Sequence, residues 1–226
     1  MQGEAVNGPS RPLEVRELGT VPYARAVELQ SDLVTKRRMG EIPDTLLLLE
    51  HPHVITLGSG SDPAHVLADD DERARLGIEL FPSGRGGDVT YHGPGQLVAY
   101  PILDLKPDRK DLHRYLRDLE QVLISTVGAF GIDAVRSDGR TGVWTGVGKI
   151  AAIGVRVSSG WITSHGVALN VSTDLEYFAT IVPCGIPDRD VSSLERELQR
   201  PVSMPEATRA LVEAFSSVFS LEILVV

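Results

Sequence analysis

The sequence predicts a single domain of the α+β class. Strand-like segments crowd the middle of the chain, while amphipathic helical segments lie near both ends and once in between. The order is not the regular alternation of strand and helix that a doubly wound parallel sheet requires. The 226 residues, 42% of them hydrophobic, suffice to bury one large core. No boundary demands a second domain.

The first residues of the chain are polar, and we interpret residues 1–12 as a flexible lead-in to a domain spanning residues 13–226. They contain no hydrophobic segment typical of a signal peptide. No apolar run approaches the ~20 residues of a membrane helix. With one cysteine and no export signal, we expect a cytoplasmic protein and no membrane partner.

The first half of the chain predicts one amphipathic helix and several short strands. Pro22 suits the first turn of a helix, and apolar residues follow it at helical spacing. Strands are expected at residues 46–49, 54–57 and 97–105, with a loop and a short helix at 63–76. Pro101 lacks an amide hydrogen, so it predicts an edge position or a bulge for the last of these strands.

The second half predicts two longer helices around a group of strands. Apolar spacing indicates a helix over residues 112–127, capped by Asp108 or Asp111 and ended by Gly128 or Gly131. A final helix begins at Ser203, where Glu206 completes a capping box. Strands are expected at 132–135, 143–145, 150–157 and 162–171, and a helical turn or two at 174–180.

The net charge of −9 argues against nucleic acid as the main partner, because phosphate binding needs a basic face. An acidic partner would need a local basic patch. Two candidate sets are Lys36, Arg37 and Arg38, and Lys110, Arg114 and Arg117. Either set also fits an ordinary solvated helix surface.

The single cysteine, Cys184, follows an apolar stretch and stands between Pro183 and Gly185. One thiol cannot form an internal disulfide, so it is inert packing, half of an intermolecular bridge, or a nucleophile. A free thiol has a pKa of ~8.5 and needs assistance to react at neutral pH. The residues around it leave all three interpretations open.

Lys149 begins an apolar, small-residue segment and follows Gly148. In a partly dry pocket, desolvation would lower the lysine pKa and allow it to act as a base. If it stays charged, it would instead lower the pKa of a nearby thiol. Either effect would activate Cys184 if the two side chains meet, although an exposed lysine at a strand start also fits.

The glycine-rich segment from Gly84 to Gly87 matches neither a Walker A loop nor a dinucleotide-binding fingerprint. It could still wrap closely around a ligand. A metal site is not favoured, because the histidines show no HExxH spacing and the only cysteine stands apart. A serine hydrolase is not favoured either, since no G-x-S-x-G elbow occurs.

Taken together, four blocks of sequence resemble the lipoyl(octanoyl) transferase family over about residues 46–194. The blocks are Glu50-His51-Pro52 with Thr56-Leu57-Gly58; Arg85 through Pro101; Gly148-Lys149-Ile150 with Ala152-Ile153-Gly154; and His165 through Val171 leading to Pro183-Cys184-Gly185-Ile186. Basic residues often follow the first block in the family, whereas this chain has Ser59-Gly60-Ser61.

The resemblance implies a fold like the catalytic domain of biotin and lipoate protein ligases, a mixed sheet with flanking helices. It implies transfer of an octanoyl group from octanoyl-acyl carrier protein to a lysine of lipoyl domains, the first step of endogenous protein lipoylation. The acceptors would be the E2 subunits of 2-oxoacid dehydrogenases and the glycine cleavage H protein. No cofactor or metal is implied.

The same resemblance assigns roles to residues. Cys184 would carry the acyl group as a thioester, and Lys149 would lower its pKa or act as a base. The acyl pocket would be lined by Arg85, Gly86, Gly87, Asp88, Val89, Thr90, Tyr91, His92, Ala152, Ile153, Gly154, Gly166, Val167 and Ala168.

Three alternatives compete with this interpretation. An ATP-dependent lipoate or biotin ligase would use free acid and nucleotide and would not depend on Cys184. A thioesterase would release free octanoate without an acceptor. A non-catalytic acyl-binding module would bind the carrier protein without gaining covalent mass. The pairing of Lys149 with Cys184 within the larger pattern favours the transferase.

Overall fold

The computed structural model describes residues 11–137, 139–182 and 190–224. Its helices are α1 (Tyr23–Met39), α2 (Asp70–Leu76), α3 (Leu112–Gly128), α4 (Leu194–Leu198) and α5 (Met204–Phe219), with short 3₁₀ helices at Pro63–His65 and Leu175–Thr180. Its strands are β1 (Arg11–Thr20), β2 (Asp44–Glu50), β3 (Val54–Leu57), β4 (Glu79–Pro82), β5 (Val89–His92), β6 (Gln96–Ile102), β7 (Val135–Ser137), β8 (Arg140–Trp144), β9 (Lys149–Val157), β10 (Thr163–Asn170) and β11 (Leu221–Leu224).

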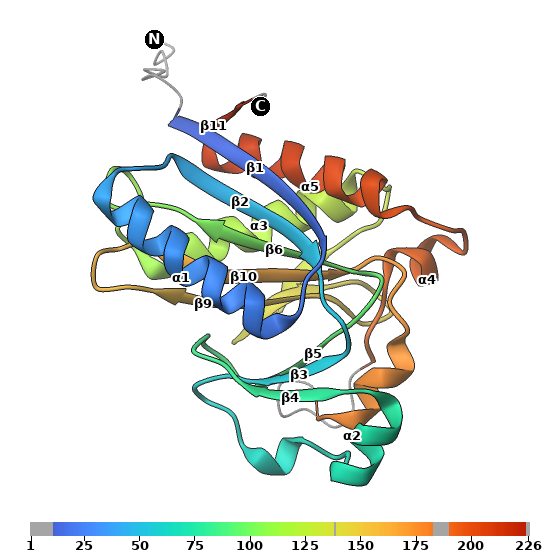
Figure 1. Cartoon of the computed structure of the whole chain (residues 1–226). Coiled ribbons are helices and arrows are strands. Elements are labelled where there is room, and N and C mark those ends of the chain that lie inside the picture. The colour runs from blue at the N-terminus through green and yellow to red at the C-terminus, as the bar shows by residue number, and fades with distance from the viewer. Residues whose placement is uncertain (1–10, 138, 183–189, 225–226) are drawn as a thin grey trace.

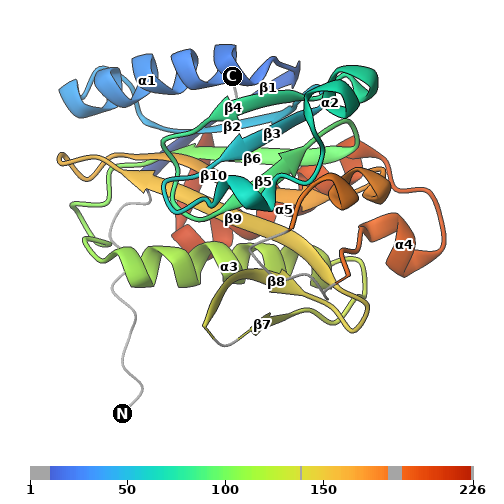
Figure 2. The same cartoon turned by 90° about the horizontal axis from the view of Figure 1, so that it is seen from below.

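The strands form two sheets. The larger has the order β11-β1-β2-β6-β10-β9-β8-β7, and the smaller has the order β4-β3-β5. Parallel pairing joins β1 to β11 and to β2, and β3 to β4, while the other pairs are antiparallel. Helix α1 covers one face of the large sheet, and α3 and α5 cover the other (Figures 1 and 2). The small sheet lies beside the α1 face. This mixed arrangement confirms the expected α+β class.

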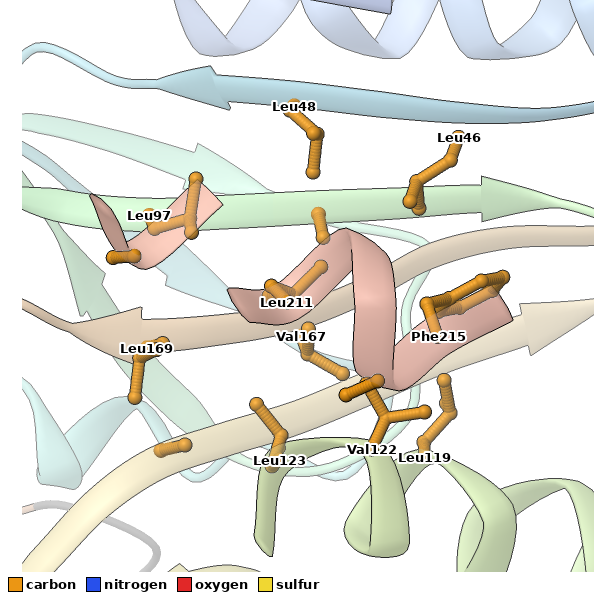
Figure 3. Close-up of a cluster of buried hydrophobic side chains, with 14 of the residues drawn as sticks. Leu46, Leu48, Leu97, Leu119, Val122, Leu123, Val167, Leu169, Leu211 and Phe215 are labelled. Carbon is orange, nitrogen blue, oxygen red and sulfur yellow. The ribbon is translucent and has the colours of Figure 1, made fainter. Parts of the chain in front are cut away.

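The main core lies between the large sheet and the helices α3 and α5 (Figure 3). Residues Leu46 and Leu48 of β2 point into it, and α5 contributes Leu211 and Phe215. Because β2 is covered on both faces, its four consecutive leucines are all buried. The apolar run in the sequence therefore predicts the strand correctly.

Helix α1 packs on the opposite face of the sheet. Ala26 and Leu33 lie in a second cluster with Leu47 and Leu49 of β2. The alternation of side chains along a strand sends neighbouring leucines to opposite sides, so β2 joins both cores. The helix ends at Gly40, whose φ of 76° is in the left-handed region that glycine adopts most easily.

Side-chain caps fix the starts of the two long helices behind the sheet. Asp111 accepts hydrogen bonds from the backbone amides of His113 (2.9 Å) and Arg114 (3.1 Å) at the start of α3. Ser203 accepts one from Glu206 (3.4 Å) at the start of α5. Both sequence-predicted caps are confirmed, and each satisfies amides that have no partner within the helix.

Pro101 lies in the interior of the large sheet, so the prediction of an edge strand is wrong. Strand β6 has β2 on one side and β10 on the other. Proline is tolerated there because the regular pairing of β6 with β10 ends at Ala99, before Pro101 is reached. The Thr163 hydroxyl donates to the Pro101 carbonyl instead, at 2.6 Å.

Several short elements carry no strong pattern in the sequence. Strand β1 begins at Arg11, two residues inside the predicted lead-in, and β4, β5, β11 and α4 are absent from the sequence prediction. The strand expected at 132–135 lies instead at Val135–Ser137. No helix in the described ranges is long and apolar enough to cross a membrane.

Candidate active site

A cavity of about 460 Å³ lies between β9 and β10 of the large sheet and the loop that leads into β5 of the small sheet. It extends along the strand pair from Lys149, at the start of β9, to His165 on β10. Its lining includes Arg85, Gly87, Asp88, Val89, Thr90, His92, Lys149, Ala152, Ile153, Gly154, Gly166, Val167 and Ala168.

The wall formed by β9 and β10 consists of small residues set in register. Ala168 pairs with Ala152, and Gly166 pairs with Gly154. Directly paired residues share a face of the sheet, and the two alanines add only methyl groups to this face. At Gly154 the missing side chain lets Arg85 and the Gly86 carbonyl pack against β9, 2.9 Å and 3.2 Å from the position of a Cβ. The two strands form the floor of the cavity.

Gly166 has a packing reason to be glycine. A Cβ built on it would lie 2.1 Å from the carbonyl oxygen of Ala99 and 2.6 Å from Cδ of Pro101. Both distances are far below van der Waals contact. The backbones of β10 and β6 therefore approach each other at this point in a way that only glycine permits.

The opposite wall is the glycine-rich loop, which Arg85 holds in place. The Arg85 side chain is only 6% exposed. It donates to the carbonyl oxygen of Thr56 at 2.7 Å and to the Thr56 hydroxyl at 2.8 Å and 3.1 Å. The next amide, of Gly86, donates to the Val155 carbonyl at 2.9 Å and joins the loop to β9. A planar guanidinium with several donors can anchor a loop in this way.

His92 presents a neutral ring to the cavity. Burial, assisted by the neighbouring His51, lowers the pKa of His92 to about 3. Its Nδ1 lies 2.6 Å from Oε1 of Gln96, whose Nε2 donates to Oδ1 of Asn170 at 2.9 Å. Since Gln96 offers its oxygen to His92, Nδ1 is the donor in that bond, and Nε2 carries the lone pair.

The hydrogen bonds continue from Asn170 to the neighbourhood of Lys149. Asn170 Nδ2 donates to the Ser192 carbonyl at 2.9 Å, and the Ser192 amide donates to the Lys149 carbonyl at 2.9 Å. A buried chain of polar groups thus connects His92 to the backbone at Lys149. Satisfied buried networks of this type fix one arrangement of the side chains they contain.

Lys149 enters the cavity from the first residue of β9. Its amide donates to the Asp190 carbonyl at 3.0 Å, and its Nζ lies 5.1 Å from the centroid of the Trp144 ring. A Cβ at Gly142 would stand 2.7 Å from Cε of Lys149, so the absent side chain makes room for the lysine stem. An ammonium over an indole face is a favourable contact.

Two residues expected in the pocket are absent from its lining. Gly86 contributes its backbone to the join with β9. Tyr91 points to the other side of β5, where its hydroxyl lies 2.7 Å from Nδ1 of His53 and its ring stacks on Tyr177. The His92 side chain borders the cavity, and the side chain of its neighbour Tyr91 points to the opposite face of β5. Cys184 lies outside the described residues.

Sequence reasoning did not assign several lining residues. Tyr23, Tyr100, Arg140, Trp144 and His165 all face the cavity. Tyr100 and His165 fall inside two of the recognised blocks, so their motifs held a signal. Tyr23 stands at the start of α1 and donates to or accepts from the Ser83 hydroxyl at 2.7 Å. The helical spacing of the apolar residues after Pro22 indicates only a buried position for Tyr23.

Protein groups occupy both ring nitrogens of His51, beside the cavity. His51 lies 2.6 Å from the Val21 carbonyl through Nδ1 and 2.8 Å from the Tyr100 hydroxyl through Nε2. Burial lowers the pKa of His51 to about 4. Among the described residues, no three His, Cys, Asp or Glu side chains are grouped to hold a metal ion.

Comparison with known proteins assigns the chain to a family. The model of the lipoyl protein ligase A/B catalytic domain matches residues 22–216. The chain belongs to this family. An octanoyltransferase from Rubrobacter xylanophilus is 55% identical over 91% of this chain and 93% of its own length. One from Solibacter usitatus is 52% identical over 93% and 94%. The expected family membership is confirmed.

Solved structures share the fold at low sequence identity. A bipartite lipoate protein ligase from Thermoplasma acidophilum superposes with a TM-score of 0.71 at 18% identity, covering 95% of this chain and 86% of its own. The biotin protein ligase of Aquifex aeolicus, in complex with biotin and ATP, gives 0.55 at 14% identity, covering 92% and 70%. The expected ligase-like architecture is thus confirmed.

Proposed function

We propose that this chain is an octanoyltransferase that acts in protein lipoylation. The observation that carries the proposal is the high identity, 46–55%, to relatives named octanoyltransferase along nearly the whole chain. The cavity supports it, because its floor of alanine and glycine suits a narrow alkyl chain. Burial of each methylene would contribute ~0.8 kcal/mol to binding.

Cys184 and Lys149 are the proposed reacting groups. The Cys184 thiolate attacks the carbonyl carbon of the donor thioester, and the carrier thiol leaves with a proton. The neutral amine of the acceptor lysine then attacks the enzyme thioester, an amide forms as the carbon–sulfur bond breaks, and the leaving Cys184 sulfur takes up the proton that the amine loses. Exchange between thioesters is nearly even in free energy and amide formation is downhill, so no nucleotide is needed.

Two observations support a role for Lys149 in both steps. It lines the cavity, and its backbone is paired to Asp190 and Ser192, which follow Cys184 by six and eight residues in the chain. A positive amine near the thiol would lower the thiol pKa, and the same group could exchange a proton with the leaving group. The hydrogen-bonded network from His92 through Asn170 would hold Ser192 beside Lys149.

The proposed donor is octanoyl-acyl carrier protein. The proposed acceptors are lipoyl domains of 2-oxoacid dehydrogenase E2 subunits and the glycine cleavage H protein. One structural neighbour, the ligase from Thermoplasma acidophilum, is described together with its E2 lipoyl domain, which supports an acceptor of this type. A thiol that must stay free suits a reducing compartment, and we propose the cytoplasm.

The decisive experiment incubates the protein with octanoyl-acyl carrier protein in the absence of an acceptor and measures its intact mass. We expect the mass of one octanoyl group to be added, and we expect no addition to Cys184→Ala. Addition of a lipoyl domain should then remove the label from the enzyme and place it on the domain. Labelling of Cys184→Ala, or transfer that requires ATP and free octanoate, would contradict the proposal.

Lys149→Ala tests the second group. Acylation should slow by at least 10²-fold, the usual contribution of a positioned acid or base. Lys106→Ala is the matched control, because Lys106 is half exposed and pairs with Asp104 outside the cavity. Equal rates for the two variants would remove Lys149 from the mechanism.

A further inference from the structure

A second cavity, of about 290 Å³, lies between α1 and the hairpin formed by β9 and β10. We call it the hairpin pocket. Helix α1 contributes Gln30 and Arg38 to it, and the two strands contribute Arg156 and His165, together with several serine and threonine side chains. His165 also borders the larger cavity, so one ring separates the two spaces. Figure 1 shows α1 lying across this hairpin.

Two buried side chains in the hairpin pocket have polar atoms without a partner in the described part of the chain. Gln30 is 3% exposed and His165 is 6% exposed. Gln30 Oε1 accepts the His165 amide at 2.6 Å, which leaves Gln30 Nε2 and His165 Nδ1 without hydrogen bonds to the described protein groups. Buried polar atoms without a hydrogen-bond partner are unfavourable and uncommon. Gln30 Nε2 is a donor and borders the hairpin pocket, so an acceptor on a bound ligand would satisfy it.

The charges around the hairpin pocket are positive and not neutralised. Neither Arg38 nor Arg156 forms an ion pair with any residue that the structure describes. By contrast, the adjacent Lys36 pairs with Asp32 at 2.8 Å, and Arg37 pairs with Asp44 at 2.7 Å. No acidic side chain is among the described residues that line the pocket. Guanidinium groups in this setting select oxyanions.

We propose that the hairpin pocket binds a small phosphate-type oxyanion. Two guanidinium groups, the Gln30 amide and the neighbouring hydroxyls offer more donors than the two oxygens of a carboxylate can accept. A phosphate group offers three or four oxygens to the same donors. Lys149 does not line the hairpin pocket, and this binding does not depend on the proposed acyl transfer.

The test is a calorimetric titration of the full chain with inorganic phosphate, at pH 7.5 and constant ionic strength. We expect saturable binding at one site in the parent protein. Gln30→Glu keeps an oxygen for the His165 amide but replaces the donor with a negative oxygen, and it should weaken binding at least tenfold. Arg156→Gln should weaken it by a similar factor.

Arg25→Gln is the matched control, because Arg25 lies on the same helix, is exposed, and pairs with Glu28 away from the pocket. Its affinity should stay within twofold of the parent. Absence of saturable binding, or equal binding by the parent and Arg156→Gln, would overturn the proposal. Arg156 is exposed, so that variant should fold even if Gln30→Glu does not.

A second titration with glycerol phosphate distinguishes the source of the phosphate group. Tighter binding than inorganic phosphate would identify an organic phosphate ester as the ligand, whereas equal or weaker binding would identify the free ion. Repeating both titrations with Cys184→Ala should give unchanged affinities. That result would separate this site from the proposed catalytic one.

Discussion

The two walls of the main cavity are built by opposite means. The strand wall, from β9 and β10, is built of small residues. Neighbouring groups pack directly against Gly154 and Gly166, and Ala152 and Ala168 add only methyl groups. The loop wall owes its shape to long polar side chains. Arg85 and His92 there are buried and bonded to neighbouring groups.

The two walls therefore control different properties of the cavity, its width and the positions of its polar groups. The strand wall sets how much space an alkyl chain finds, because its alanines and glycines add little side-chain volume. The loop wall determines the positions of the polar groups, because hydrogen bonds hold each of them in a desolvated environment. Solution conditions should therefore disturb the loop wall, and added side-chain volume should disturb the strand wall.

The largest expected effect is the response to acid of three buried histidines: His92 on β5, His165 on β10 and His51 between β2 and β3. Burial lowers the pKa of His51 and His165 to about 4 and that of His92 to about 3. Between pH ~6.5 and ~4 the unfolded chain binds protons at these rings that the folded chain does not bind. Stability should therefore be full above pH ~6.5 and fall as the pH drops, by up to ~1.4 kcal/mol per pH unit for each histidine.

Urea unfolding at pH 7.5 and at pH 5 measures this loss. His51→Gln should reduce the difference in unfolding free energy between the two pH values, although it also removes a hydrogen bond. His113→Gln, in the exposed first turn of α3, should leave the difference unchanged. A parent protein equally stable at both pH values would show that the rings are not held neutral.

A smaller effect is expected from a single methyl group on the strand wall. Gly166→Ala must push β10 away from the Ala99 carbonyl, and we expect a loss of about 1–3 kcal/mol of unfolding free energy. Gly128→Ala, at the end of α3 with no atom within 4 Å of the new methyl group, should cost nothing. Chemical denaturation of both variants provides the comparison, and equal stabilities would contradict the close approach.

The smallest effect concerns the chain length that the cavity accepts. Ala168→Val adds two carbons at a residue that lines the cavity, so it should displace about two methylenes of an acyl chain. At ~0.8 kcal/mol each, the preference for octanoyl over hexanoyl should fall by about tenfold. Competition between the two acyl-carrier donors measures the ratio. Ala24→Val, on the exposed side of α1, should leave it unchanged.

The sequence predicted the elements whose side chains repeat with a clear period. The leucines of β2 and the amphipathic α3 and α5 are examples, since burial on one or two faces imposes a pattern. The short strands β4 and β5 were missed, because four residues beside a glycine-rich loop hold too few repeats. The internal place of Pro101 was missed as well, because it depends on how the neighbouring strand β10 departs from regular pairing.

For the candidate site, the motifs predicted which segments meet but not how each side chain turns. Most residues from Arg85 to His92 do face the cavity, whereas Tyr91 faces away because strands alternate. Tyr23 joins the site only through the packing of α1 on the sheet, a tertiary contact that no local pattern contains. The hydrogen-bonded chain through Gln96 and Asn170 likewise joins residues far apart in the sequence.

One backbone bond, from the Gly86 amide to the Val155 carbonyl, ties the glycine-rich loop to the large sheet at 2.9 Å. If the cavity widens to accept a bulkier acyl group, this hydrogen bond must lengthen or break. The hydrogen-exchange rate of the Gly86 amide in deuterated solvent therefore reports how often the cavity entrance opens. A bound acyl chain that contacts both sheets should slow this exchange.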